Sequence, residues 1–508
     1  MHDKHTRSFK PILIHLLAII FSILFDSSFG FSLRPCYALV IYLLLIITSP
    51  IKYLFSIVTL SLSAISSLYA PISFLYGSPN INILLSIGHS NFSESLEFLS
   101  AIPFTYYLFS ATVIFITLVL LKNSSLLDIK HRKLTLFILL SILLFRPISS
   151  ATTKGEMEID FTPVKFIKRF CDAAITVNKD NSRLKSLINK KTTLTPTNAS
   201  DKFDTYILVV GESARRDFMG AYGFKINNTP FMSSVNGTIF NKYISAASST
   251  QMSLSTSFSV HNKPQNNLIR LAQKQGLDTW WISNQGSYGD DDSQISAIGK
   301  QADHPVFIKK GEYDATNHDD VELFPYIKTA LQTNSKNKLI VVHLMGSHSN
   351  FCTRTANKYD DFYVNKTLSC YVQTIKNTDI LLSHIAKAAN EENKKWTLMY
   401  FSDHGLSFVG KENESTLTLT HGDKTKQNFS VPLFITSYDS TRRAVRELPY
   451  SAMDFLSLYL FWTGSRENTI AQTCNPIEIN KCKNNEIKVI DFDHNIKSYS
   501  DLINEPVM

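Results

Sequence analysis

Side chains that can bind a metal ion stand beside four short apolar runs in the second half of the chain. They are carboxylates and imidazoles, which zinc and manganese accept as ligands. The set consists of Glu212 after TYILVV (205–210), His348 after KLIVVHLMG (338–346), Asp403 and His404 after WTLMYF (396–401), and His421 before VPLFIT (431–436). Any one of them alone would most simply be a turn residue or a helix cap. Four such positions at strand ends indicate a metal site.

A hydroxyl-rich segment, SAASSTQMSLSTSFS (245–259), could supply a nucleophile for this site. Its hydroxyls suit the start of a helix, where they cap free backbone N–H groups. The same place suits catalysis, because helix-terminal N–H groups and a metal ion would both stabilise an anion. An activated hydroxyl there could attack phosphorus or sulfur. Composition alone does not select one hydroxyl of the segment.

The elements that must position these residues belong to an α/β sheet. From residue 204 onward, short apolar runs alternate with helical ones, which is typical of strands with helices packed on them. Ligands of open α/β sheets bind at the carboxyl ends of the strands. If the four apolar runs share one sheet, we expect the candidate ligands at one edge. Acidic clusters at 289–292, 317–320 and 491–494 follow no such strand, and we expect them to be solvated.

The first 150 residues have a different pattern, with long apolar runs and few charges. A helix needs about 20 apolar residues to cross a bilayer. We expect five transmembrane helices, three on uncharged runs and two on shorter runs that extend into their flanks. The runs are 11–25, 35–51, 53–87, 101–121 and 134–145.

The charges between these runs predict the orientation. Basic residues gather in the segments that are cytoplasmic if the N-terminus is inside, which is the usual bias of membrane proteins. These residues are Lys4, Arg7, Lys10, Lys52, Lys122, Lys130, Arg132 and Lys133, against Arg34 alone in the outer loops. Five spans then place everything after residue 150 outside the cytoplasm. A cleaved signal peptide at 1–30 is disfavoured, because no small-residue cleavage site follows and further apolar runs do.

The pattern predicts three parts: a transmembrane domain at 1–150, a linker with helices at 151–203 and an α/β domain at 204–508.

In the loop 78–100, apolar residues at near-helical spacing lie opposite Glu94 and Glu97, as in a helix of the membrane interface. The composition, 44% hydrophobic with a net charge of +8, excludes a disordered chain. The basic excess is too diffuse to indicate nucleic acid.

Six cysteines are present without a CxxC motif, so a thiolate zinc site is not indicated. Outside the cytoplasm, thiols at short separations usually pair. We therefore expect the disulfides Cys352–Cys370 and Cys474–Cys482, which leave Cys171 without a partner. These bonds would be structural.

Taken in order, VVGES, the hydroxyl-rich segment, HLMGSH, SDHG and THG…VPLFI resemble the phosphoethanolamine transferases of the bacterial inner membrane. No single motif is specific, but their order is, and with the five spans the resemblance covers essentially the whole chain. It implies a sulfatase-like domain of the alkaline phosphatase superfamily in the periplasm. The implied activity is zinc-dependent transfer of phosphoethanolamine from phosphatidylethanolamine to lipopolysaccharide (lipid A or a core sugar) or another periplasmic glycan, through a phosphothreonine.

The resemblance also implies roles for individual residues. Glu212, Thr250, Asp403 and His404 match the family's zinc ligands, with manganese a second choice of metal. Thr250 matches the nucleophile, and Ser248 and Ser249 are neighbouring alternatives.

Two further pairs of residues match less central positions of the family. His348 and His421 match histidines that hold a second metal ion or the transferred group. Asn284 and Glu94 fall in regions that contact substrate in relatives. A cysteine pair that flanks the nucleophile in colistin-resistance members is absent here, which leaves lipid A open as the acceptor.

Two alternatives remain. One is a phosphoglycerol transferase, phosphodiesterase or sulfatase of the same superfamily, although no sulfatase maturation motif (C/S-x-P-x-R) lies near Thr250. The other is a membrane sensor that keeps the fold without catalysis, against which the complete set of metal-type residues argues.

Overall fold

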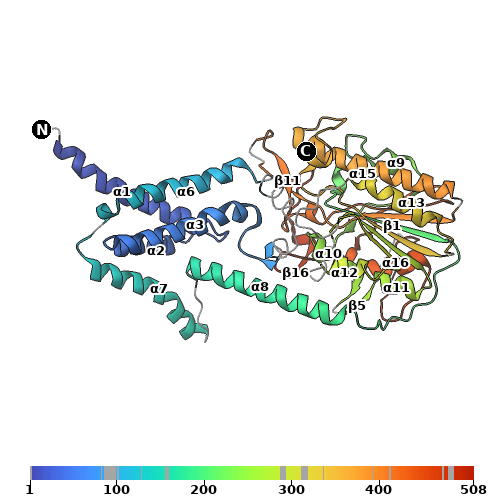
Figure 1. Cartoon of the computed structure of the whole chain (residues 1–508), viewed down its shortest axis with the longest axis horizontal. Coiled ribbons are helices and arrows are strands. Elements are labelled where there is room, and N and C mark those ends of the chain that lie inside the picture. Colours follow the sequence, from blue (N-terminus) through green and yellow to red (C-terminus); the bar gives the residue numbers. More distant parts are fainter. Residues whose placement is uncertain are drawn as a thin grey trace. The chain divides into compact units, whose positions relative to one another are not determined.

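The chain forms two compact units in the computed structural model, a helical unit from residues 1–84 and 102–177 and an α/β unit from residues 85–101 and 178–508 (Figure 1). The structure describes residues 3–81, 83–84, 99, 102–127, 129–154, 160–261, 263–286, 293–309, 319–335, 337–392, 394–410, 413–471, 474–478 and 486–507.

The helical unit contains the long apolar helices that the sequence predicts. They are α1 (Asp3–Ser27), α2 (Pro35–Thr48), α3 (Lys52–Tyr76), α6 (Phe104–Lys122) and α7 (Arg132–Lys154). Of these, α1, α3, α6 and α7 are long and apolar enough to cross a membrane. Helix α2 has 14 residues, about 21 Å, and is shorter than the bilayer core, so the five-span count stays a prediction.

A buried carboxylate holds three segments of the helical unit together. Asp26, at the end of α1, is 1% exposed. It accepts hydrogen bonds from the backbone N–H of Arg34 (2.9 Å) and from the hydroxyl of Thr162. Thr162 begins α8 (Thr162–Leu187), the helix that leads out of this unit. Since a buried charge is costly without partners, this carboxylate fixes where α1, α2 and α8 meet.

The α/β unit is built on an eight-stranded sheet in the order β13-β2-β12-β9-β1-β8-β6-β7. The four apolar runs of the sequence analysis are β1, β8, β9 and β12, so they do share one sheet. The strand bounds are β1 Thr205–Gly211, β2 Gly237–Phe240, β6 Asp278–Ser283, β7 His304–Phe307, β8 Lys338–His343, β9 Trp396–Ser402, β12 Leu433–Ser437 and β13 Arg443–Arg446.

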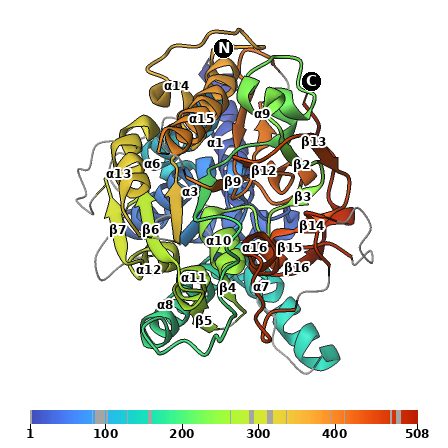
Figure 2. The same cartoon turned by 90° about the vertical axis from the view of Figure 1, so that its right-hand side faces the viewer.

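Helices cover both faces of this sheet (Figure 2). In β1, Ile207 and Val209 face the core on the side of α13 (Phe324–Gln332) and α15 (Lys366–Glu391). Tyr206, Leu208 and Val210 face the opposite core, against α10 (Thr250–Phe258), α11 (Leu268–Lys274) and α16 (Phe455–Thr463). All seven residues of β1 are buried, as expected for a central strand covered on both sides.

The register of the central strands brings their carboxyl ends together. Strands β8 and β9 are both parallel to β1, and Val210 pairs with His343 while Gly211 pairs with Ser402. Strand β12 is antiparallel to β9. A residue that precedes β12 therefore lies at the same edge of the sheet as residues that follow β1, β8 and β9.

The disulfide Cys352–Cys370 joins α14 (Phe351–Arg354) to α15. Cys474 is also disulfide-bonded, but Cys482 lies outside the described residues, so their pairing stays a prediction. Among the described cysteines, Cys36 and Cys171 are free and exposed.

A buried arginine anchors the loop that follows β1. The Arg215 side chain is fully buried, and its guanidinium donates to both carboxylate oxygens of Asp217 (2.9 and 2.7 Å). It also donates to the backbone carbonyls of Leu406 (3.3 Å) and Glu505 (2.8 Å). Bidentate pairing of this kind is strong and directional. The arginine thus ties the β1 loop to the loop after β9 and to the C-terminal segment.

We expect Arg215→Met to lower the free energy of unfolding by about 3 kcal/mol, because it leaves Asp217 and two carbonyls without their donor. The thermal unfolding midpoint of the full chain in detergent should fall by roughly 5 °C. The matched control is Arg216→Met, at the neighbouring and partly exposed position. Equal midpoints for the two variants would contradict this account.

Candidate metal centre

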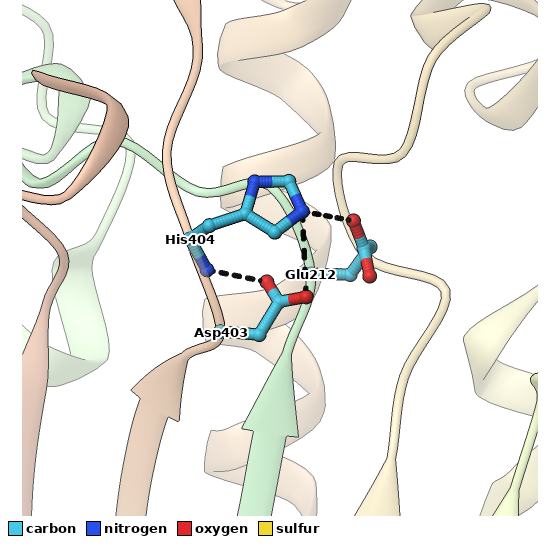
Figure 3. A group of neighbouring side chains, drawn as sticks. All are labelled: Glu212, Asp403 and His404. Atoms are coloured by element: carbon cyan, nitrogen blue, oxygen red, sulfur yellow. Dashed lines mark hydrogen bonds and ion pairs between the residues drawn. The ribbon is translucent and has the colours of Figure 1, made fainter. Parts of the chain in front are cut away.

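Three of the candidate ligands meet at the edge of the sheet where β1 and β9 end. Glu212 follows β1, and Asp403 and His404 follow β9 (Figure 3). The Nε2 atom of His404 lies 3.3 Å from Oε1 of Glu212 and 3.5 Å from Oδ2 of Asp403. All three residues are at most 1% exposed, and one ligand atom from each lies within 4.8 Å of the others. Such a buried group has the donors and the spacing to hold a metal ion.

The hydroxyl-rich segment brings Thr250 to the same place. Thr250 is the first residue of α10. Its Oγ1 donates to Oε2 of Glu212 (2.8 Å) and lies 3.3 Å from Nε2 of His404. The structure therefore gathers all four residues of the expected zinc set, with the threonine oxygen at a helix N-terminus. Their role as ligands stays a prediction.

The charges of the cluster favour a cation between its carboxylates. Burial alone would raise the pKa of Glu212, but His404 holds that pKa well below its usual value. Burial and then the charge of Glu212 raise the pKa of Asp403 to about 8. Burial opposes protonation of His404, yet the two carboxylates outweigh it and raise its pKa to about 9. The site is thus stabilised by positive charge.

One buried oxygen of the cluster fits a metal ion in particular. Oδ1 of Asp403 accepts from the backbone N–H groups of Ser213 (3.0 Å) and His404 (2.7 Å). Within the described part of the chain, its Oδ2 is buried and accepts no hydrogen bond. A carboxylate oxygen without a donor is costly. A cation at this point would satisfy it.

The two remaining histidines line the same site. The ring centre of His421 lies 4.7 Å from that of His404 and 6.4 Å from that of His348. Burial, followed by the neighbouring charge of His404, lowers the pKa of His421 to about 3. His421 is therefore neutral, and its unprotonated ring nitrogen can bind a metal ion or accept a hydrogen bond. His348 is held by Arg354, whose Nε donates to the His348 carbonyl (3.0 Å) and whose Nη2 lies 3.4 Å from Nδ1.

The neighbour of Asn284 reaches the cluster. Asn284 is buried and donates to Oδ1 of Asp320 (2.8 Å). Gln285 donates to Oε2 of Glu212 (3.0 Å) and to the carbonyl of Leu344 (3.0 Å). Sequence reasoning missed Gln285 because an uncharged amide beside a strand end carries no distinctive signal. The other expected substrate contact, Glu94, lies outside the described residues.

Ser213 also supports Glu212 and was not foreseen. Its hydroxyl donates to Oε1 of Glu212 (2.6 Å). Its backbone has a φ of +57°, a conformation that costs a non-glycine residue about 1–3 kcal/mol. Strain of this kind persists where the surroundings impose it. Here it turns the chain so that one residue can contact both carboxylates.

Asp320 is not the solvated residue that the sequence analysis expects. Its carboxylate is buried, which raises its pKa. It accepts hydrogen bonds from the backbone N–H groups of Met345 and Gly346, each at 2.8 Å, and from Asn284. Gly346 has a φ of +46°, and a Cβ atom there would lie 2.9 Å from the backbone N of Glu212. Asp320 thus fixes the loop between β8 and His348 against Glu212.

The fold and this cluster define a class of protein, the sulfatases, and the sulfatase family model matches residues 204–465. Phosphoethanolamine transferase OpgE of Escherichia coli is 35% identical over 454 residues, which cover 85% of each chain. A putative phosphoethanolamine transferase of Haemophilus influenzae is 29% identical, covering 72% of this chain and 76% of its own. The chain therefore belongs to the phosphoethanolamine transferases of the sulfatase family, and it is an enzyme of that class.

Solved structures show the same fold. The integral membrane protein lipooligosaccharide phosphoethanolamine transferase A of Neisseria meningitidis has a TM-score of 0.56 and 14% identity, covering 91% of this chain and 98% of its own. The periplasmic domain of EptC from Escherichia coli, in complex with Zn, has a TM-score of 0.52 and 18% identity, covering 62% and 98%. The architecture is therefore an α-helical membrane domain followed by a sulfatase-like α/β domain.

We expect Asp320→Asn to lower transferase activity about tenfold, because an amide offers one acceptor oxygen where the carboxylate takes three N–H donors. The measurement is release of diacylglycerol from phosphatidylethanolamine by the full-length protein. Bound metal should stay the same, since Asp320 touches the loop before His348 and none of Glu212, Asp403 or His404.

The control is Asp319→Asn, because Asp319 caps a short helix through Val321 N–H and asparagine caps a helix equally well. Unchanged activity in Asp320→Asn would show that this carboxylate does not position the loop.

Proposed function

We propose that the protein transfers phosphoethanolamine from phosphatidylethanolamine to a periplasmic glycan, lipopolysaccharide or another, through Thr250. The observation that carries this proposal is the position of Thr250 Oγ1, 2.8 Å from Glu212 and 3.3 Å from His404, at the N-terminus of α10. The name of OpgE, which is 35% identical to this chain, supports the transferred group. The zinc complex of the EptC domain supports zinc as the metal, held by Glu212, Thr250, Asp403 and His404.

The residues of the site divide the reaction between them. Zinc, when bound, would supply positive charge that lowers the pKa of a ligating hydroxyl. Thr250 gives its proton to Glu212, its oxygen attacks phosphorus while the bond to the diacylglycerol oxygen breaks, and the diacylglycerol oxygen takes up that proton as it leaves. The N–H groups at the start of α10 stabilise the phosphoryl oxygens.

The second half of the reaction returns the enzyme to its starting state. An acceptor hydroxyl attacks phosphorus on Thr250, the bond between phosphorus and the threonine oxygen breaks, and the proton lost by the acceptor returns to the threonine oxygen. His421 is unprotonated, because burial and the charge of His404 lower its pKa, and its free ring nitrogen can accept a hydrogen bond from the attacking hydroxyl. His348, held by Arg354, would orient the phosphoryl group.

We also propose that this enzyme lies in the inner membrane with five spans and its catalytic unit in the periplasm. The charge bias of the segments between the apolar runs supports this orientation, as does the membrane architecture of the Neisseria relative. The functional division would then be 1–150 for the membrane, 151–203 for the linker and 204–508 for catalysis.

The full chain, incubated with phosphatidylethanolamine and zinc, should carry a phosphoethanolamine adduct on Thr250 that intact-mass and peptide mass spectrometry detect. Thr250→Ala should abolish the adduct, because the Thr250 hydroxyl contacts both Glu212 and His404. Ser249→Ala and Thr256→Ala, on the same segment, should keep it. An adduct that persists on Ser248 or Ser249 would reject Thr250, and an adduct formed only from phosphatidylglycerol would move the enzyme to the phosphoglycerol transferases.

Glu212→Gln and Asp403→Asn should weaken zinc binding at least tenfold, because each removes a charged oxygen from a buried site. Zinc per chain is measured by elemental analysis after dialysis against a weak chelator. Asp361→Asn, at an exposed ion pair with Lys376, should keep the wild-type content. Equal zinc in all three variants would place the metal elsewhere.

A further inference from the structure

The helical unit has a cavity of its own, about 650 Å³ in volume, which none of the metal-centre residues described above lines. It lies where the start of α2 faces the middle of α7. The residues that line it are Arg34, Cys36, Tyr37, Ser141, Ile142, Phe145, Arg146 and Asp160. A cavity of this size exceeds what a single buried water occupies and suits part of a larger ligand.

One side of the cavity is strongly charged. Nη1 of Arg34 lies 2.5 Å from Oδ2 of Asp160, and Nε of Arg146 lies 3.5 Å from the same oxygen. Nζ of Lys165 lies 3.4 Å from the other oxygen. Partial burial would raise the pKa of Asp160, but Arg34 and Lys165 together lower it, so Asp160 is a carboxylate. Among the described side chains, three cations thus surround one anion.

The other side of the cavity is apolar. Ile142 and Phe145 come from α7 and Tyr37 from α2. Tyr37, Val40 and Leu43 of α2 pack with Leu139 of α7 to join the two helices. A ligand that fits both sides is amphipathic, with an anionic group beside the guanidinium groups and a hydrocarbon part along α7. Guanidinium groups match the oxygens of a phosphate especially well.

The two arginines are also exceptions to the charge pattern of the membrane half. The basic residues of the other loops lie in segments predicted to be cytoplasmic, whereas Arg34 lies in a predicted outer loop. Arg146 lies near the end of α7 that leads to residue 154, which is the outer end in the same orientation. Outer positions are normally poor in arginine. Both arginines pair with Asp160, and a phosphate at the membrane surface would be a second anion within their reach.

We propose that the helical unit binds one phospholipid at this cavity, with its phosphate held by Arg34 and Arg146 and an acyl chain along Ile142 and Phe145. Phosphatidylethanolamine and phosphatidylglycerol share this chemistry, and the experiment separates them. The inference rests on the proposed function in one respect: phosphatidylethanolamine, the proposed donor, is one of the phospholipids that would fit the cavity. The site binds lipid and performs no chemistry.

Two native cysteines allow a direct test. Cys36 lines the cavity and is free, and Cys171 is a second free, exposed cysteine that does not line it. Delipidated full-length protein carrying Thr250→Ala is labelled with N-ethylmaleimide in detergent, and peptide mass spectrometry follows both cysteines. Added phosphatidylethanolamine or phosphatidylglycerol should slow labelling of Cys36 about tenfold and leave Cys171 unchanged. Diacylglycerol, which lacks the phosphate, should protect neither.

Two variants probe the two sides of the cavity. Arg34→Gln with Arg146→Gln should abolish the protection of Cys36, whereas Arg132→Gln, at the opposite end of α7, should keep it. Ile142→Trp keeps every charge and fills the cavity, so it also should remove the protection by lipid. It serves as a second test if the double variant folds poorly, which the labelling rate of Cys171 would report.

Protection by diacylglycerol equal to that by phospholipids, or no protection by any lipid, would overturn the proposal. Stronger protection by phosphatidylethanolamine than by phosphatidylglycerol would identify the donor lipid as the ligand, and equal protection would support a general phospholipid site. Because the test uses Thr250→Ala, its result does not depend on the transfer reaction. If the wild-type chain formed no Thr250 adduct while lipid still protected Cys36, only the proposed function would be rejected.

Discussion

The α/β unit depends on one electrostatic constraint, which is that two carboxylates and an imidazole share a space almost closed to water. Glu212 and Asp403 repel each other there, and burial penalises both charges. Positive charge on His404, or a metal ion, offsets that repulsion, and Thr250 hydrogen-bonds to Glu212. Burial of these carboxylates therefore costs free energy unless a positive charge lies directly beside them. That condition makes precise positioning of its elements necessary.

The fold meets this condition through contacts that lie outside the cluster. The register of β1 with β9 sets Glu212 next to Asp403, and Arg215 ties the loop after β1 to the loop after β9 and to the C-terminal segment. Asp320 holds the loop after β8 close to Glu212. Arg215 and Asp320 are both buried, and some of their hydrogen-bond partners come from distant segments. Loss of one partner would leave a charge unpaired, so the supports are rigid as well as stabilising.

In the helical unit, carboxylates likewise hold separate segments together, with fewer charged groups at each place. Asp26 joins α1, α2 and α8 through a backbone N–H and a hydroxyl, and Asp160 gathers Arg34, Arg146 and Lys165. Hydrophobic contacts alone would let apolar helices slide past each other, because their surfaces are similar all round. Polar contacts of this kind select one arrangement. They also leave basic groups beside apolar ones, which is the composition of a phospholipid site.

Local sequence patterns predict most elements of this protein and its candidate ligands. Glu212, Asp403 and His404 stand directly after apolar runs. The four central strands and the apolar helices follow from local composition, although α3 ends at Tyr76 where the apolar run continues to residue 87. Contacts between distant residues follow from the fold and not from local pattern. His421 directly follows β11 (Thr418–Thr420), and its ring centre lies 4.7 Å from that of His404. Gln285 reaches Glu212 while Asn284 contacts Asp320, and Asp320 is buried although it belongs to an acidic cluster. The reason is physical: periodicity and composition are local properties, whereas strand order, strand direction and the partners of a buried charge depend on contacts between segments far apart in the chain.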